Sequence, residues 1–193
     1  PDWPHADADT RRAWDLAAQR LAPHAAAWVE PAWPADLPDL SALQLAVMTH
    51  EMARALRPDR LQHGPALSER LRTLLDAGMQ ISGAQHAAHL RQTLAARQRI
   101  DALFIGSGGP DGVDVLLSPS TPGEAPAGLD GTGDPLFCRG WTLLGLPCIH
   151  LPFSLGHSGL PVGLQLVGRH GDDHRLIAAA HWAHARLQRG DAT

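Results

Sequence analysis

The chain contains 193 residues, 44% of them hydrophobic, and carries a formal net charge of −4 at pH 7. This length suits one domain with a sizeable core, or one lobe of a larger protein. The negative charge argues against nucleic-acid binding, which needs a basic face, and no apolar run approaches the ~18 residues of a membrane span.

Three absences add to these limits. The sequence has no lysine and no tyrosine, and it begins with Pro1 instead of methionine, so we expect a fragment or a processed chain. Cys138 and Cys148 are too few for a disulfide framework, and we interpret them as reduced thiols of a cytoplasmic protein.

Apolar periodicity and capping residues in the first half predict four helices and one short strand. The helices are expected at residues 10–21, 40–57, 67–77 and 82–104, and the strand at 25–29. Asp7 or Asp9 can cap the first helix, Pro58 is expected to end the second, and Gly78 is a C-terminal cap for the third. The fourth opens with a Ser-x-x-Gln capping box at 82–85. Its inward-facing residues are predicted to be Ala87, Leu90 and Leu94.

The second half predicts strands separated by helices and a long loop. A turn is expected at 105–112, strands at 113–117, 148–153 and 162–167, a loop at 118–135, a helical turn at 137–144 and a final helix from Asp172 to Gly190. The inward-facing residues of this last helix are predicted to be Leu176, Ile177, Ala180 and Leu187. This order favours the α/β class, with a mixed β-sheet flanked by helices. We expect a single domain or lobe over 1–193, mainly helical at 1–104 and strand-rich with a C-terminal helix at 105–193.

The known catalytic and metal-binding motifs are incomplete in this chain. The segment 156–160 lacks the last glycine of a nucleophile elbow, the absence of lysine excludes a P-loop, and 106–111 fails the dinucleotide fingerprint. Cys148 opens an apolar strand, which favours an inert core position. Two pairs of histidines have helical i, i+3 spacing, namely His86 with His89 and His181 with His184. No HExxH motif and no nearby Cys or carboxylate set accompanies them, so we expect neither a metal nor another cofactor.

Several sequence blocks nevertheless resemble the C-terminal region of the amidase signature family. The blocks are Asp114–Pro119, Pro122–Pro126, Gly131–Pro135, Trp141–Pro147, Leu151–Pro152 and Gly159–Gly168. Their order and spacing are specific, and the resemblance is strong over about 113–187 and looser before that. Two residues depart from the family pattern: we would expect Asn at the position of Cys138, and Thr or Ser at the position of His150.

The resemblance implies an amide hydrolase whose triad of a nucleophilic Ser, a cis-peptide Ser and a Lys belongs to an N-terminal half. Since this chain has no lysine, it cannot complete that triad, and we expect no catalytic residue within it. It would supply scaffold and part of the pocket for a small-molecule amide substrate. The pocket candidates are Thr132, Gly133, Asp134, Phe137 and Trp141, although the two aromatic residues could equally be core residues. The alternative is a stand-alone binding or interaction module derived from the same fold, and such a chain could form a homodimer to cover exposed apolar surface.

Overall fold

The computed structural model describes residues 2–104, 112–129 and 131–188. They form two compact units, one from residues 1–34 and 100–193 and the other from residues 35–99. The predicted turn at 105–112 and the predicted end of the last helix at Gly190 lie largely or wholly outside the described residues. The expected single domain therefore stays a prediction, and each unit is described by itself.

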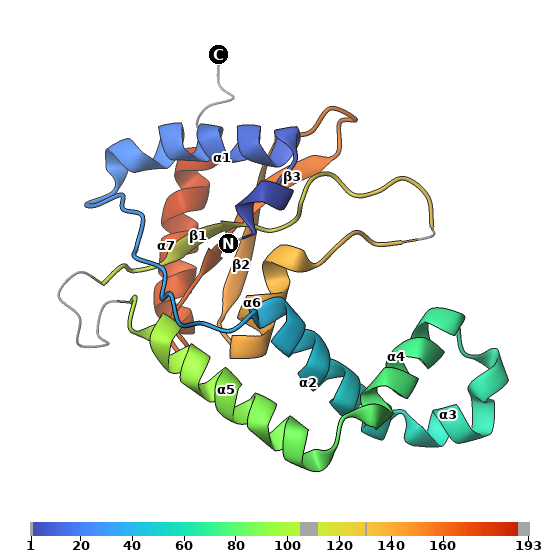
Figure 1. The fold of residues 1–193 in the computed structure, drawn as a ribbon. Coiled ribbons are helices and arrows are strands. Elements are labelled where there is room, and N and C mark those ends of the chain that lie inside the picture. The colour runs from blue at the N-terminus through green and yellow to red at the C-terminus, as the bar shows by residue number, and fades with distance from the viewer. Residues whose placement is uncertain (1, 105–111, 130, 189–193) are drawn as a thin grey trace. The chain divides into compact units, whose positions relative to one another are not determined.

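The first unit contains a three-stranded sheet with helices on it (Figure 1). Its elements in chain order are η1 (Trp3–His5), α1 (Ala8–Leu21), η2 (Ala22–His24), β1 (Leu116–Pro119), α6 (Leu136–Leu144), β2 (Cys148–Leu155), β3 (Pro161–Val167) and α7 (Asp173–Leu187). The strand order is β1-β3-β2, and both pairings are antiparallel. An isolated parallel bridge joins Phe104 to Val113. This arrangement confirms the α/β class.

One face of the sheet forms the hydrophobic core of this unit. Leu164 and Leu166 of β3 lie there with Leu151 of β2, and α1 and α7 pack against them. Gln165 lies between the two leucines in sequence, so its side chain points to the opposite face. Full burial of a leucine stabilises the fold by about 1.5–3 kcal/mol relative to exposure. The order of apolar and polar residues in β3 therefore fixes which face carries α1 and α7.

The second unit is helical. It contains α2 (Leu40–Ala55), α3 (Arg57–His63), η3 (Gly64–Ala66), α4 (Glu69–Gln80) and α5 (Gly83–Asp101) as far as residue 99. Gly78 lies inside α4, and a Cβ at this position would be 2.0 Å from the Thr49 carbonyl oxygen of α2. The predicted C-cap at Gly78 is therefore wrong, because this glycine serves the close approach of two helices.

Most predicted elements are confirmed, and the exceptions have local causes. Asp7 caps α1 by accepting a hydrogen bond from the Thr10 N–H, and the capping box before α5 closes with Gln85 N–H to Ser82 Oγ at 3.2 Å. Pro58 ends α2 as expected but also lies in the first turn of α3, a helix that was not predicted. The strand at 25–29 is wrong, since these residues have no strand pairing.

Two predicted buried faces are also wrong in part. On α5, Leu90 and Leu94 are 44% and 53% exposed, while the buried positions are Thr93, Ala96 and Ile100. Ala87 is exposed as well. On α7, Leu176, Ala180 and Leu187 are buried as expected, but Ile177 is 47% exposed. The buried face of α5 was predicted wrongly because two of the residues that form it, Thr93 and Ala96, are not strongly apolar.

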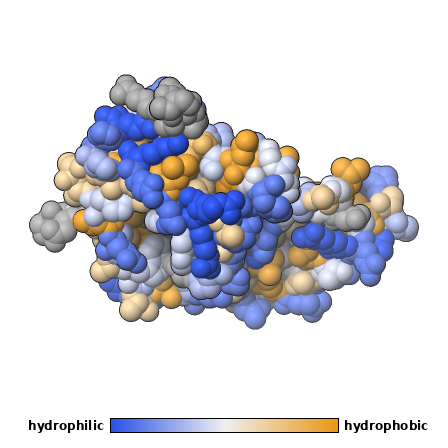
Figure 2. Space-filling view, turned by 90° about the horizontal axis from the view of Figure 1, so that it is seen from above, coloured by the Kyte–Doolittle hydropathy of each residue, from blue (hydrophilic) through white to orange (hydrophobic). Residues whose placement is uncertain are grey.

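The surface is mixed in character. Seen from above, hydrophilic residues cover much of the face and hydrophobic residues form several separate patches (Figure 2). Leu155 and Leu160, on either side of the β2–β3 turn, are 65% and 41% exposed. Within the described ranges, we find no helix with the length and apolar character needed to cross a bilayer.

Candidate functional site

The predicted pocket residues divide between an exposed loop and a packed helix. Thr132, Gly133 and Asp134 are exposed, and Asp134 pairs with Arg139 at 3.2 Å. Gly133 has φ of +90°, a left-handed conformation that favours glycine. These exposed loop residues remain candidates for contact with a substrate.

The two aromatic candidates belong to α6. Phe137 is 6% exposed and therefore a core residue. Trp141 is half-buried and makes an edge-to-face contact with Trp33, with ring centroids 6.1 Å apart. Of the five candidates, Trp141 is the aromatic residue that retains exposed surface for a ligand.

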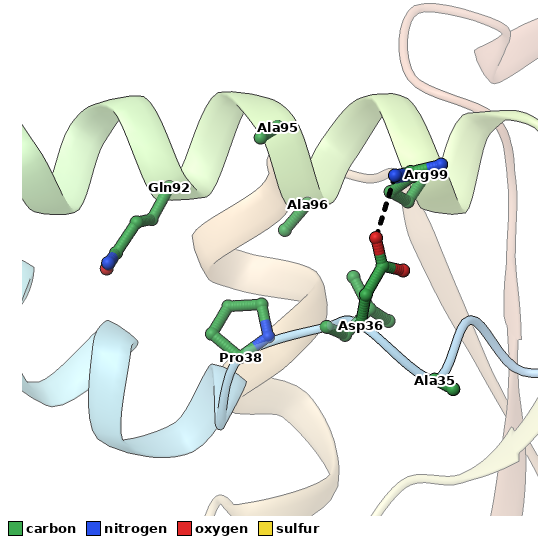
Figure 3. Close-up of a pocket in the computed structure, with 8 residues that line it drawn as sticks. Ala35, Asp36, Pro38, Gln92, Ala95, Ala96 and Arg99 are labelled. Atoms are coloured by element: carbon green, nitrogen blue, oxygen red, sulfur yellow. Dashed lines mark ion pairs between the residues drawn. The ribbon is translucent and has the colours of Figure 1, made fainter.

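Two surface pockets of about 540 Å³ lie away from these candidates. The first is in the second unit, where Pro38, Gln92 and Ala96 line it and Asp36 pairs with Arg99 at 2.7 Å (Figure 3). The second is in the first unit, and its lining residues are Leu16, Pro152, Phe153, Ser154, Leu155 and Gln188. Both are wide open, and the charged side chains that line the first are the paired Asp36 and Arg99.

Beneath the 118–142 segment lies a cluster of polar side chains on the face of the sheet opposite to the core. The buried Gln165 amide donates hydrogen bonds to the Pro119 carbonyl at 2.8 Å and the Phe137 carbonyl at 3.0 Å. Ser120 Oγ is 2.6 Å from His150 Nδ1, and the Cys138 thiol donates to the Ser120 carbonyl at 3.3 Å. The two residues that depart from the family pattern, Cys138 and His150, therefore meet on Ser120.

The pair of Ser120 and His150 has the contact distance of a nucleophile and its base. Burial lowers the pKa of His150, which favours the neutral ring, and burial raises the pKa of the Cys138 thiol. Ser120, however, is only 7% exposed, so a substrate carbonyl has little access to its hydroxyl. This arrangement serves to fix the 118–142 segment on the sheet. Cys148 is exposed, so the predicted core position is wrong. Partial burial, and then the neighbouring Cys138, raise the pKa of its thiol to about 11, which agrees with an inert thiol.

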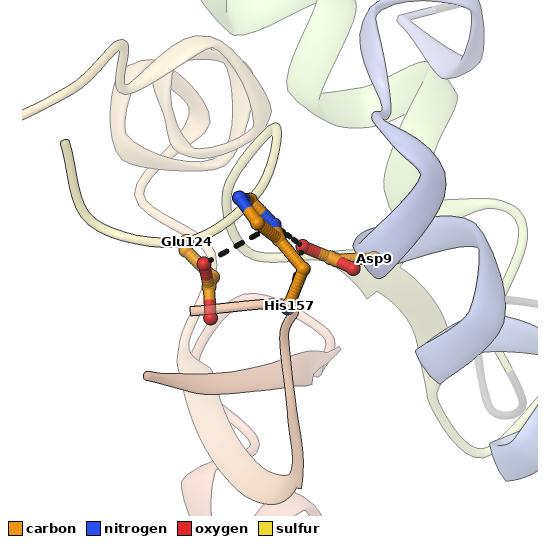
Figure 4. Close-up of side chains that lie close together, drawn as sticks. All are labelled: Asp9, Glu124 and His157. Carbon is orange, nitrogen blue, oxygen red and sulfur yellow. Dashed lines mark hydrogen bonds and ion pairs between the residues drawn. The ribbon is translucent and has the colours of Figure 1, made fainter. Parts of the chain in front are cut away.

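A second cluster joins three segments that are far apart in the sequence (Figure 4). His157, in the β2–β3 turn, places Nδ1 2.7 Å from Asp9 Oδ2 of α1 and 3.4 Å from Glu124 Oε2 of the long loop. Asp9 also pairs with Arg12 and accepts the His157 backbone N–H at 3.2 Å. Glu124 accepts the backbone N–H groups of Ser158 and Leu160. The cluster thus ties the turn to the helix and the loop.

Glycines allow the three segments to approach this closely. A Cβ at Gly156 would lie 2.3 Å from Glu124 Cγ, and a Cβ at Gly123 would lie 1.8 Å from Asp7 Oδ2. The sequence offered no signal for this cluster, because Asp9, Glu124 and His157 share no motif spacing. In the sequence, Gly156 and His157 belong to the incomplete nucleophile elbow at 156–160.

The charges of the cluster stabilise one another. The pKa of Asp9 falls from 3.8 to about 2, mainly because the His157 side chain donates a hydrogen bond to it. Burial alone would raise the pKa of Glu124, but the hydrogen bonds from Leu160 and Ser158 lower it overall. The hydrogen bond to Asp9, and then the charges of Asp9 and Glu124, raise the pKa of His157 above 6.5.

We expect these shifts to make the contribution of His157 to stability depend on pH. The histidine contribution is complete below pH 6.5 and is lost as pH rises through the raised folded pKa. The Asp9 contribution is complete above pH 3.8 and is lost as pH falls toward about 2. The difference in Tm between the wild type and His157→Ala, measured in EDTA, should therefore be largest between pH 3.8 and 6.5. A difference that stays constant from pH 3 to pH 9 would contradict this.

The histidine pairs considered as metal ligands have other environments. His86 stacks on His50 with ring centroids 4.1 Å apart and lies 3.5 Å from Glu51. Among the described residues, the group of three ligating side chains within 4.8 Å of one another is Asp9, Glu124 and His157. Neither i, i+3 pair of histidines belongs to this group.

Comparison with known proteins places the chain in a family. The amidase family model matches residues 6–177. A mitochondrial glutamyl-tRNA(Gln) amidotransferase subunit of Mus musculus is 37% identical over 86 residues, which cover 40% of this chain and 16% of that protein. The corresponding amidotransferase subunit of Psychrobacter sp. (strain PRwf-1) is 43% identical over 75 residues, which cover 35% of this chain and 15% of that protein.

Solved structures agree over nearly the whole chain. A crystal structure of an amidase matches with a TM-score of 0.82 and 25% identity, covering 96% of this chain and 44% of the amidase. The 6-aminohexanoate cyclic dimer hydrolase complexed with its substrate matches with a TM-score of 0.69 and 21% identity, over 94% of this chain and 42% of that enzyme, and so supports the fold alone. The chain spans less than half of the proteins that it matches. With 172 consecutive positions inside the family model and the amidase fold over 96% of its length, the chain belongs to the amidase family.

Proposed function

We propose that this chain is the C-terminal portion of an amidase-type hydrolase that cleaves carboxylic amide C–N bonds. In this proposal, a Ser–cis-Ser–Lys triad from an N-terminal half carries the reaction, and this chain supplies scaffold and part of the substrate pocket. The observation that carries it is the match to 44% of an amidase by a sequence without any lysine. The two unpaired cysteines support a cytoplasmic, reducing location.

The sheet supports the same proposal. In the described sheet, β2 is an edge strand with β3 as its neighbour, and it ends at the exposed Leu155. Eight-residue edge strands with apolar side chains are open to pairing with further strands. An N-terminal half that adds strands here would extend the sheet on which Gln165 holds the 118–142 segment. In that segment Trp141 and the loop residues Thr132, Gly133 and Asp134 are exposed or half-buried.

We expect the purified 193-residue chain to hydrolyse a simple aryl amide no faster than buffer. The reason is that it lacks the lysine that manages the proton in the proposed triad. The measurement is release of the aryl amine with and without a serine-directed reagent. Turnover by this chain that the reagent abolishes would overturn the proposal.

The matched experiment extends the reading frame upstream of Pro1. We expect the longer chain to contain a lysine and a Gly/Ser-rich segment and to show turnover that the serine reagent and a Lys→Ala substitution both abolish. A frame without these features would favour the alternative, a stand-alone binding or interaction module. In that case the 193-residue chain should sediment as one defined species, a monomer or a homodimer, with little dye-accessible apolar surface.

A further inference from the structure

The cluster of Asp9, Glu124 and His157 has a geometry that fits a ligand beyond its own hydrogen bonds. Each of the three side chains offers one ligating atom, and these atoms all lie within 4.8 Å of one another. Nδ1 of His157 is 2.7 Å from Asp9 Oδ2 and 3.4 Å from Glu124 Oε2. The two carboxylates thus converge on one imidazole nitrogen (Figure 4).

The burial of the three side chains is uneven in a way that suits an ion open to water on one side. The side chains of Asp9 and Glu124 are 4% and 6% exposed, whereas that of His157 is 77% exposed. The carboxylates are held in place by backbone N–H groups of the β2–β3 turn and by Arg12. The exposed imidazole can therefore move to accommodate an ion, while the two anionic ligands are already fixed.

The local charge favours a cation. Asp9 and Glu124 meet in the cluster, and Asp7 is close enough to act on His157 electrostatically, while Arg12 supplies the positive charge on the opposite side of Asp9. Three carboxylates against one guanidinium leave a negative site when the imidazole is neutral. A divalent ion would balance this charge in place of the imidazole proton.

The distances also suit a small transition-metal ion. With metal–ligand bonds of about 2.1 Å, two ligands of a tetrahedral ion lie about 3.4 Å apart. The Nδ1–Oε2 distance already has this value, and the Nδ1–Oδ2 distance needs to lengthen from 2.7 Å. Two carboxylates and one imidazole are a donor set that zinc accepts, and water would complete the coordination.

We propose that Asp9, Glu124 and His157 bind a divalent transition-metal ion of the zinc type. Nδ1 and one oxygen of each carboxylate coordinate the ion. The Nδ1 proton is released to solvent, and the neutral ring keeps its other proton on Nε2, since the side chain is 77% exposed. The bound ion links α1, the 121–124 segment and the β2–β3 turn, so its binding stabilises the first unit. The site belongs to this chain alone and does not depend on the proposed amide chemistry.

The test measures Zn²⁺ binding to the 193-residue chain by calorimetry, with Tm as a second readout. We expect one site per chain, and a Tm that rises with the concentration of free Zn²⁺. Co²⁺ should bind at the same site with a visible absorption spectrum that reports ordered coordination. His157→Ala should weaken Zn²⁺ binding at least tenfold and remove most of the rise in Tm, since it deletes a ligand.

Glu124→Gln is the second variant. Its amide oxygen can still accept the N–H groups of Ser158 and Leu160, which both donate to Oε1, but the anionic ligand is lost. It should weaken Zn²⁺ binding at least tenfold, and its Tm in EDTA measures separately what the loss of the Glu124 charge beside His157 costs the fold. The matched control is His181→Ala with His184→Ala, which removes an exposed i, i+3 pair on α7.

The control should bind Zn²⁺ like the wild type. Loss of binding in this control, or unchanged binding in His157→Ala, would overturn the proposal, and so would the absence of any saturable site in the wild type. If Glu124→Gln unfolds, the binding measurement on His157→Ala tests the proposal by itself. The His157 side chain is mostly exposed, so we expect this variant to fold.

Discussion

Replacing Gly163 by alanine is expected to lower the free energy of unfolding of the first unit by about 3 kcal/mol, at the upper end of the range for overpacked sites. Gly163 is opposite Pro152 in the β2–β3 ladder, next to the irregularity between Pro152 and Ser154. A Cβ would lie 2.1 Å from the Leu151 carbonyl oxygen and 2.8 Å from Pro152 Cα, both of them backbone atoms. The strands must therefore separate, and the midpoint of urea unfolding followed by circular dichroism should fall.

Gly131→Ala is the matched control for this substitution. Gly131 is in the same unit, its backbone is outside the left-handed region, and a Cβ there has nothing within 4 Å. We expect its unfolding free energy to stay within about 0.5 kcal/mol of the wild type. Equal unfolding midpoints for Gly163→Ala and Gly131→Ala would contradict this prediction, because β2 and β3 could then move apart without a loss of stability.

The second large effect is expected for Gln165→Leu. Its amide donates to the carbonyls of Pro119 and Phe137, and leucine would leave both of these oxygens without that donor. An unsatisfied buried polar group costs about 1–3 kcal/mol, so we expect a loss of about 2 kcal/mol or more. Because both carbonyls belong to the 118–142 segment, the amides of α6 should also lose protection against hydrogen exchange.

Gln19→Leu, an exposed position on α1, is the control for a glutamine-to-leucine change in the same unit. It should leave both the stability and the exchange of α6 near the wild-type values. If Gln165→Leu retained wild-type protection of α6, Gln165 would not be the residue that holds this segment on the sheet. The polar cluster around Ser120 and His150 would then carry that role by itself.

Local signals located most of the elements. The Ser82–Gln85 capping box fixed the start of α5, and the apolar runs after Pro147 and Pro161 located β2 and β3 to within two residues. These predictions succeeded because capping and strand patterns depend on residues that are neighbours in the chain. The strand at 25–29 failed because a short apolar run forms a strand only when another strand pairs with it.

The buried faces were harder to predict because burial depends on the partner. On α5, the apolar Leu90 and Leu94 are exposed while Thr93 and Ala96 are buried. Gly78 looked like a helix end and is instead the contact point of α4 with Thr49 of α2. For Gly78 the neighbouring helix decided the outcome, and the sequence of α4 alone does not indicate this contact.

The sequence by itself determined the family, the α/β class and the lack of a lysine for the triad, since ordered motif blocks and composition are properties of the chain alone. Only the tertiary structure decided which side chains meet. Asp9, Glu124 and His157 come from three segments separated by more than thirty residues each, and Cys138 and His150 meet on Ser120 through the sheet. The physical reason is that such contacts arise from strand register, helix packing and the close approach that Gly156 permits, none of which has a fixed spacing along the chain.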